Sequence, residues 1–384
     1  MLPLLSLLML AAVPARAEPR VPAQDSEIVE TLPAVSGWSR EERRLRRELV
    51  QRPRDAAVAI EAANGYLDLA RTQGDARYAG HAMGVLQAWA PVSAQTPNDI
   101  LVMHATVAQF LHDFDGAEAT LKLALAQQPG NAQGWLTLAT IQRVRGRYAD
   151  SDTACRALVR IRQNLYAAAC LAENAGLRGD HQAAREALQG LLQTPALQGP
   201  QQVATRQWLL TTVAEIEELA GRPATADAAY RQALAADRSG YDLLAYSDFL
   251  LAQGRAGEVP ALLKAEPRSD AVLLRLAIAA RRQGAAQPPR DAEELAARFE
   301  AAGLRPGTAA LHAREQALFA LDVQGDATRA LALARLNVQL QREPIDLLVL
   351  ARAAAATKDD AARREAKALM QQIGLRDARV EALL

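Results

Sequence analysis

Apolar and polar residues recur with the period of amphipathic α-helices from about residue 55 to about residue 375. Each amphipathic segment is long enough for roughly three to four helical turns. Short breaks that carry Gly, Asp or Pro separate the segments, and strand patterns are nearly absent. The glycines in these breaks are Gly74, Gly146, Gly179, Gly221, Gly254, Gly284 and Gly325. The pattern predicts an all-α chain in which each glycine lies between two helices.

The breaks return at nearly constant intervals. The interval from Gly146 to Gly179 equals that from Gly221 to Gly254, and the next one, from Gly254 to Gly284, is three residues shorter. A period of roughly 30–35 residues is typical of stacked helical hairpins, each of which needs its neighbours to bury its apolar face. The sequence therefore predicts a solenoid of hairpins.

The sizes of side chains at fixed positions predict how one hairpin packs. Trp135 and Ala139 are four residues apart, so that a large side chain lies beside a small one that lets a second helix approach. Gly146 suits the left-handed backbone at the end of the first helix. Tyr148 then opens the second helix, and the small Ser151 is placed at the helix crossing.

The same pattern of side-chain sizes occurs earlier in the chain at a constant offset. Pro129 stops the second helix of this earlier unit. The matching pairs are Leu101 and Trp135, Ala105 and Ala139, Phe114 and Tyr148, and Ala117 and Ser151. Ala226, Tyr230 and Ala233 show the small-large-small spacing of a second helix again. These residues resemble the tetratricopeptide repeat (TPR) family, whose unit of roughly 34 residues favours such side chains at these places.

The resemblance implies a right-handed α-solenoid of about eight units over residues 55–375. Residues 255–310 depart from the repeat, because one unit is shortened there and another has inserted prolines. Before the solenoid, residues 18–54 are expected to hold an extended lead-in and a capping helix. In that helix, Ser39 and Glu42 suggest a capping box, and Leu45, Leu49 and Val50 the apolar side. Residues 376–384 form a C-terminal tail.

By the same resemblance, the first helix of each unit lines a concave groove that binds a partner. The predicted groove residues are Asn64, Asp68, Arg71, Thr106, Gln109, Thr140, Arg143, Tyr166, Glu173, Trp208, Glu215, Tyr241 and Asp248, with Val102, Leu136, Thr211, Glu218 and Leu244 at equivalent positions. Charged side chains among them would be costly in a core, so a solvent-lined surface accounts for them. Aromatic residues beside charges are typical of a binding hot spot. The mixed charge favours a peptide or protein segment over a polyanion.

Composition and charge narrow the classes of function. Half of the residues are hydrophobic and only 4% are aromatic, as expected for closely packed helices. Lys plus Arg and Asp plus Glu both total 44, so the formal net charge is zero. The chain as a whole therefore has no positive electrostatic field that would favour binding to nucleic acid or anionic lipid. Phosphate-binding loops, nucleophile elbows and the common zinc motifs are missing from the sequence. We therefore expect a protein-binding scaffold that is no enzyme and has no cofactor or metal.

The histidines support a second interpretation. His104 and His112 are eight residues apart on one expected helix, and with His81 they could serve a metal-handling complex. We favour ordinary structural roles for these side chains and for His181 and His312. The alternative function is an accessory subunit that docks, by its convex face or one end, into an envelope or metal-handling enzyme complex.

The first residues have the features of a secretory signal peptide. Leu2 to Val13 is an apolar run too short to span a bilayer, and Ala15-Arg16-Ala17 fits a cleavage site. No Lys or Arg precedes the run, so only the α-amino group is positive there. We expect residues 1–17 to be removed after Ala17 and the protein to be exported, soluble and periplasmic. No cysteine near that site offers a lipid attachment point.

Cys155 and Cys170 are the only cysteines. If a turn lies near Arg162, Gln163 and Asn164, the cysteines stand equally far from it on two antiparallel helices. Bridging requires Cα atoms within about 7 Å, and an oxidising compartment permits the bond. Two outcomes remain open: a disulfide, or two small buried apolar residues.

Overall fold

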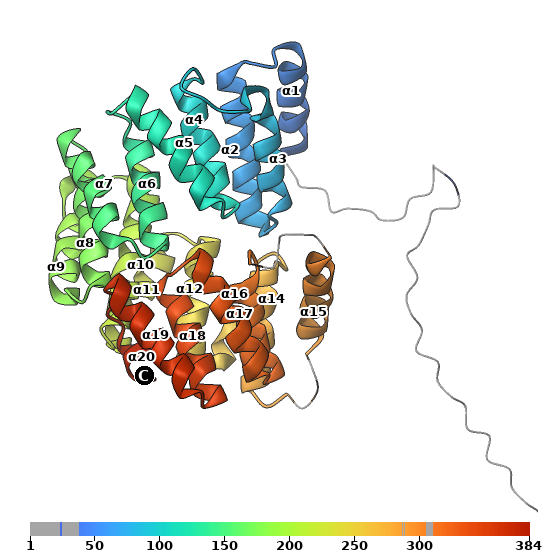
Figure 1. The fold of residues 1–384 in the computed structure, drawn as a ribbon, viewed down its shortest axis with the longest axis vertical. Coiled ribbons are helices and arrows are strands. Elements are labelled where there is room, and N and C mark those ends of the chain that lie inside the picture. Colours follow the sequence, from blue (N-terminus) through green and yellow to red (C-terminus); the bar gives the residue numbers. More distant parts are fainter. Residues whose placement is uncertain (1–23, 25–37, 286, 288, 305–309) are drawn as a thin grey trace, which may run out of the picture. The chain divides into compact units, whose positions relative to one another are not determined.

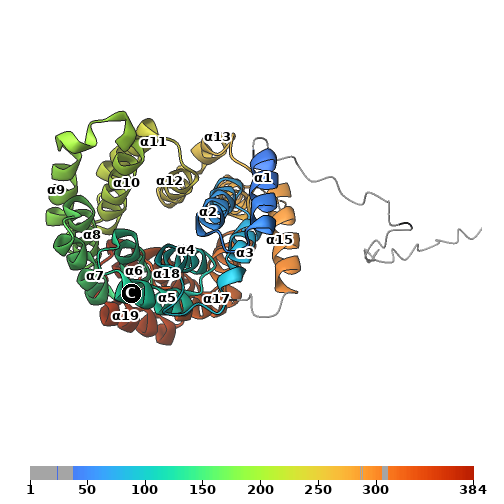
Figure 2. The same cartoon turned by 90° about the horizontal axis from the view of Figure 1, so that it is seen from above.

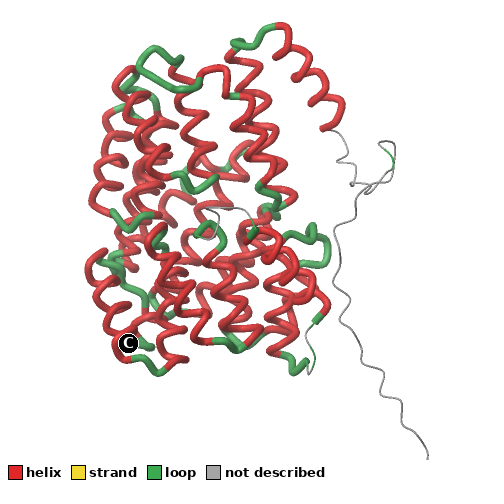
Figure 3. The backbone as a smooth tube through the Cα atoms, turned by 45° about the vertical axis from the view of Figure 1, so that its right-hand side comes forward, coloured by secondary structure: helices red, strands yellow, loops and turns green. Residues whose placement is uncertain are grey.

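The computed structural model describes residues 24, 38–285, 287, 289–304 and 310–384. The regular elements of this part of the chain are helices joined by loops, and it contains no strand (Figure 3). The chain divides into two units, residues 1–44 and 45–384, and helix α1 (Trp38–Gln51) runs through the boundary. The expected signal peptide at 1–17 and nearly all of the expected lead-in lie outside the described residues.

Helical hairpins follow one another through the larger unit (Figure 1). In the described ranges there are nine, where the sequence predicts about eight. They are α2 (Ala56–Gln73) with α3 (Arg77–Val85), α4 (Asn98–Phe110) with α5 (Phe114–Gln127), α6 (Ala132–Val144) with α7 (Tyr148–Arg160), α8 (Asn164–Leu177) with α9 (His181–Leu192), α10 (Val203–Leu219) with α11 (Pro223–Ala236), α12 (Gly240–Ala252) with α13 (Val259–Leu262), α14 (Asp270–Arg282) with α15 (Arg290–Gly303), α16 (Ala313–Phe319) with α17 (Ala327–Leu340), and α18 (Pro344–Thr357) with α19 (Asp360–Ile373).

Shorter elements complete the chain. The four-residue α13 agrees with the shortened unit that the sequence predicts near residue 255. Ala320–Gln324 extend α16 as a π-helical turn, η5. The remaining elements are the 3-10 turns η1 (Gln87–Trp89), η2 (Pro195–Leu197), η3 (Pro200–Gln202) and η4 (Ala256–Glu258), and the final helix α20 (Ala378–Glu381). The tail predicted at 376–384 thus contains a helical turn.

The corners of the hairpins need a left-handed backbone. All of the predicted corner glycines have positive φ, from 62° at Gly74 to 102° at Gly179. His112 and Lys358 adopt the same region at two other corners, and Arg162 adopts it in the turn between α7 and α8, with φ from 55° to 63°. Glycine adopts this conformation without steric cost, whereas these three residues must be held there by the packing of the helices around them.

The small residues predicted at the helix crossings are buried. Ala105, Ala117, Ala139 and Ser151 are each no more than 1% exposed. Their size lets consecutive helices pack closely, as the sequence predicts. The buried core continues from Tyr148 to Val380 as one cluster, so that late hairpins share a core with early ones.

Helix α1 corrects two details of the prediction. It begins at Trp38, so Ser39 lies inside its first turn and is no N-cap. Leu45 is 1% exposed and anchors the helix, but Val50 is 81% exposed and therefore does not belong to its apolar side. Val50 is five residues from Leu45, and five residues turn the helix through about 500°, well away from the buried stripe.

C-terminal residues contact the corners of early hairpins. The backbone N–H of Arg342 donates to the carbonyl of Val144 at 2.7 Å, and the N–H of Arg376 donates to the carbonyl of Leu177 at 2.9 Å. Figure 1 shows α19 and α20 below α6 and α8, the helices that end at Val144 and Leu177. Hairpins far apart in the chain therefore stack, and their contacts add to those between neighbours.

Gly146→Ala should lower stability more than Gly325→Ala. Both glycines have φ of 71°, so both variants carry the same left-handed strain. A Cβ at Gly146 would lie 2.9 Å from Cγ2 of Ile373, whereas a Cβ at Gly325 would meet nothing within 4 Å. Overpacking costs about 1–3 kcal/mol. We expect the free energy of unfolding, measured in urea, to be lower by this amount in Gly146→Ala than in Gly325→Ala. Equal losses would show that this corner does not pack against Ile373 in solution.

Candidate partner-binding face

The hairpins of the larger unit follow a curved path, and their first helices lie on one side of this path. Figure 2 shows α8, α10 and α12 on its inner side, with α9, α11 and α13 outside them. Side chains from successive first helices meet there. We call this surface the inner face, formed by Arg143, Tyr166, Glu173, Trp208, Glu215, Tyr241 and Asp248 on α6, α8, α10 and α12.

Ion pairs connect neighbouring first helices at both ends of the inner face. Nε of Arg143 is 3.0 Å from Oε1 of Glu173, and both side chains are 17% exposed. Nη2 of Arg275, on α14, is 2.5 Å from Oδ2 of Asp248. Arg275 was not identified from the sequence. Its position on the amphipathic segment at 270–282 is the signal that would have revealed it.

Aromatic rings occupy the middle of the inner face. Tyr166 and Trp208 stack with ring centroids 6.5 Å apart. On the next pair of helices, the hydroxyl of Tyr241 donates a hydrogen bond of 2.6 Å to Oε1 of Glu215. Tyr241 remains 65% exposed, so the hydrogen bond fixes a ring that water still reaches.

The carboxyl group of Glu215 lies in an unfavourable environment for charge. Burial raises its pKa to about 8, and the nearby carboxylates of Glu173, Glu218 and Glu343 contribute to the rise. The negative charge of Glu215 in turn raises the pKa of Tyr241 well above its usual value. At neutral pH Glu215 is therefore mostly protonated, and a cation placed beside it would favour the charged form.

Predicted groove residues on α2 are far more exposed. Asn64 is exposed, and Asp68 pairs with Arg71 at 3.1 Å with both side chains over half exposed. The guanidinium of Arg71 lies 5.9 Å from the ring centre of Phe110 on α4. These residues form a solvated surface of their own, and the structure does not join them to the contacts of the inner face.

Residues predicted on α4, α6 and α10 separate into two groups. Thr106 and Thr140 are half-buried and donate to carbonyls of their own helices, and Gln109 is also half-buried. Val102 and Thr211 were expected in the groove, but they are 7% and 2% exposed. Val102 belongs to a buried apolar cluster with Ala124 of α5 and Val92 of the loop before α4, and Thr211 contacts the next first helix, α12. The hydroxyl of Thr211, for example, donates to Asp242 at 2.5 Å.

The repeat geometry agrees with the sequence resemblance. Helices α4 and α6 begin at Asn98 and Ala132, and helices α5 and α7 begin at Phe114 and Tyr148. The two intervals are equal, and both match the unit of roughly 34 residues that is typical of this family. The chain has a TPR-like fold.

Comparisons with known proteins give only distant structural matches. No family model and no curated protein matches the sequence. The solved structures that resemble the chain include PilW, a type IV pilus biogenesis factor (18% identity, 58% of this chain and 99% of that chain, TM-score 0.40). Others are a TPR protein from Parabacteroides merdae (16%, 67% and 98%, TM-score 0.38) and yeast Tom70 (12%, 86% and 87%, TM-score 0.28). All three overlaps are partial, and the TPR-like assignment rests on the hairpins themselves.

The histidines take separate places in the TPR-like fold. His81 packs against Tyr66 with ring centroids 5.5 Å apart, and His112 stacks on Phe114 at 5.6 Å. Burial lowers the pKa of both His104 and His112. In the part of the chain that the structure describes, no three His, Cys, Asp or Glu side chains gather as a metal site. The same part holds no helix of the length and apolarity that crossing a membrane requires.

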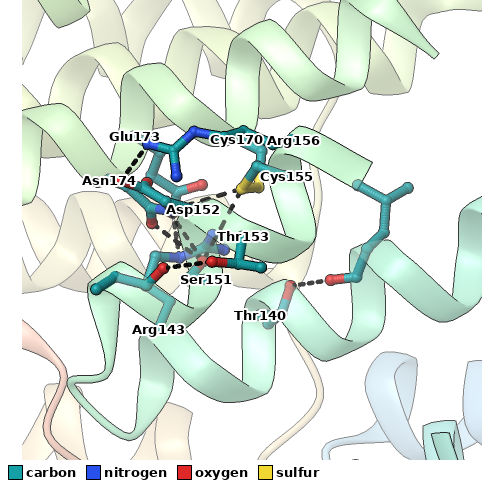
Figure 4. Close-up of a disulfide and its surroundings, with 12 residues drawn as sticks. Thr140, Arg143, Ser151, Asp152, Thr153, Cys155, Arg156, Cys170, Glu173 and Asn174 are labelled. Atoms are coloured by element: carbon teal, nitrogen blue, oxygen red, sulfur yellow. Dashed lines mark hydrogen bonds and ion pairs between the residues drawn. A yellow bond between two sulfur atoms is a disulfide. The ribbon is translucent and has the colours of Figure 1, made fainter. Parts of the chain in front are cut away.

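A disulfide joins Cys155 on α7 to Cys170 on α8, with Cα atoms 5.8 Å apart (Figure 4). A buried polar network lies beside it. The amide of Asn174 donates to Oγ of Ser151 and to Oδ1 of Asp152, both at 2.9 Å. The bridge therefore holds together the two helices that carry this network, and Glu173 of the inner face lies on the second of them.

A hollow of about 470 Å³ is lined by residues of α9, α10 and α11. Gln189, Leu210 and Gln232 are among the residues that line it. Beneath it, the buried carboxylate of Glu217 lies 3.3 Å from Nε of Arg222. The residues that line this outer hollow include no aromatic ring, unlike those of the inner face.

Proposed function

We propose that this protein is a non-catalytic scaffold of the cell envelope that binds a peptide or protein segment on the inner face. The observation that carries the proposal is Tyr241, an aromatic ring that is 65% exposed and held in place by Glu215. Large rigid aromatic side chains are enriched among residues that dominate binding energy. A ring already fixed by a hydrogen bond loses little conformational entropy when a partner contacts it.

The rest of the inner face supports a protein partner. Tyr166 and Trp208 add apolar area, and ion pairs border them at both ends. This arrangement of an aromatic centre and a polar rim is typical of protein interfaces. Helical solenoids also present extended inner surfaces to their partners. The envelope location rests on the apolar run and cleavage pattern of residues 1–17.

Tyr241 offers a cleaner test than the other anchors. Trp208 is half-buried and packs against the core, and Arg143 is held by Glu173, so that truncating either would also affect folding. A photo-reactive phenylalanine at position 241 should crosslink one partner in envelope preparations. The same residue at Gln232, which lines the outer hollow, is the matched control.

The result has two informative outcomes. Crosslinking from position 241 and not from position 232 supports binding on the inner face. Crosslinking from position 232 alone would overturn it and favour the accessory subunit that docks by its outer side.

Protein recovered from the envelope fraction should begin at Glu18, and a chain that begins at Met1 there would contradict export by a cleaved signal peptide.

A further inference from the structure

Several carboxylates, on the inner face and elsewhere in the described part of the chain, are paired with arginines from other helices. The pairs are Glu173 with Arg143 at 3.0 Å, Asp248 with Arg275 at 2.5 Å, Asp322 with Arg352 at 2.5 Å, and Glu218 with Arg379 at 2.7 Å. Glu215 is the exception. In the described part of the chain no Lys, Arg or His lies within ion-pair distance of its carboxylate, although Glu173 and Asp248 on both neighbouring first helices are paired.

Glu218, one helical turn after Glu215 on α10, shows how such a carboxylate is satisfied. The hydroxyl of Tyr230 donates to its Oε1 at 2.5 Å, and Nη1 of Arg379 lies 2.7 Å from its Oε2. Arg379 comes from α20, far along the chain. One oxygen thus accepts from a tyrosine and the other from a guanidinium.

Glu215 has the first half of this arrangement. Its Oε1 accepts from the hydroxyl of Tyr241 at 2.6 Å, and its Oε2 accepts from no residue in the described ranges. We propose that an arginine of the partner segment binds Oε2 of Glu215 and completes there the tyrosine–glutamate–arginine arrangement that Glu218 already has. This inference rests on the proposed function, because it names the chemistry of the segment that the inner face binds.

The rings around Glu215 fit a guanidinium. Tyr241 is exposed beside the carboxylate, and Trp208 lies seven residues before Glu215 on the same side of α10. Planar guanidinium groups stack on aromatic rings and bind carboxylates, so an arginine suits the site better than a lysine.

Electrostatics supports the same ligand. Burial, with Glu173, Glu218 and Glu343 nearby, raises the pKa of Glu215 to about 8. The hydrogen bond from Tyr241 opposes the rise without offsetting it. A bound guanidinium would favour the ionised carboxylate, so binding should release a proton below that pH and lower the pKa of Glu215.

The test uses acetyl-argininamide as the probe and the full exported chain with ¹³C-labelled glutamate. The carboxyl resonance of Glu215, assigned by its loss in E215Q, is titrated with pH in the presence and absence of the probe. We expect acetyl-argininamide at tens of millimolar to lower the pKa of Glu215 by about one unit, a tenfold change in proton affinity. Acetyl-citrullinamide, which is neutral and of nearly the same shape, should leave the pKa unchanged.

Glu218 is an internal control, since Arg379 already occupies its site. Its resonance should not respond to acetyl-argininamide in the wild type and should respond in R379A. A Glu215 that ignores the probe, or that responds equally to acetyl-citrullinamide, would overturn the inference. The scaffold proposal would survive that result if position 241 still crosslinks a partner, so the two failures are distinguishable.

Discussion

Arg314→Ala should destabilise the folded chain by about 3–5 kcal/mol. Arg314, on α16, pairs with Asp346 at the start of α18 through Nε to Oδ1 at 2.6 Å and Nη2 to Oδ2 at 2.9 Å. It also lies 2.5 Å from Oε2 of Glu343. Asp346 is fully buried, so removing the guanidinium would leave a charge without a counter-ion or force the carboxyl to take up a proton. Thermal or urea unfolding followed by circular dichroism measures the loss.

Arg335→Ala is the matched control for Arg314→Ala. Arg335 is 40% exposed and pairs on the surface with Glu365 at 2.8 Å, so its loss should cost about 0–1 kcal/mol. The double variant R314A/D346A should lose less than the sum of its single variants, because neither charge is then left unpaired. If Arg314→Ala costs no more than Arg335→Ala, this buried pair does not hold α16 to α18.

Removing the disulfide should cost about 3 kcal/mol, given that Cys155 and Cys170 are 15 residues apart. C155A/C170A keeps a small apolar side chain at both buried positions, so the variant mainly loses the constraint on the unfolded chain. Comparing its urea unfolding with that of the oxidised wild type measures the effect. Asn174, Ser151 and Asp152 should retain their hydrogen bonds in the variant, because they bond mainly to one another.

Reduced wild-type protein is the control for this comparison. Its stability should match that of C155A/C170A, because both lack the crosslink. Intact mass under denaturing, non-reducing conditions shows whether the bond exists in protein taken from the envelope. Two thiols that alkylate after unfolding would end the idea that Cys155 and Cys170 are joined there.

The sequence predicted the positions of the helices and corners better than it predicted the solvent exposure of individual side chains. Small residues such as Ala139 and corner residues such as Gly146 were predicted correctly because the repeat unit places them locally. Val102 and Thr211 were predicted on a solvent-lined surface and are buried. Val102 is buried with Ala124 of α5 and Val92 of the preceding loop, and Thr211 bonds to Asp242 of the next first helix. How closely these segments approach depends on loop paths and helix crossing angles, which a sequence does not show.

The sequence by itself determined the all-α hairpins, their period, the corner at Gly146 and the helices that carry Glu215 and Tyr241. All of these depend on residues within one or two units, because each hairpin packs mainly on its neighbours. The tertiary structure alone decided that Ile373 packs on Gly146, that Arg379 reaches Glu218, and that Glu215 is left without a cation in the described part of the chain. The first two contacts join the last helices of the chain to its third and fifth hairpins. They arise from small rotations summed over several hairpins, and no local pattern of residues records that sum.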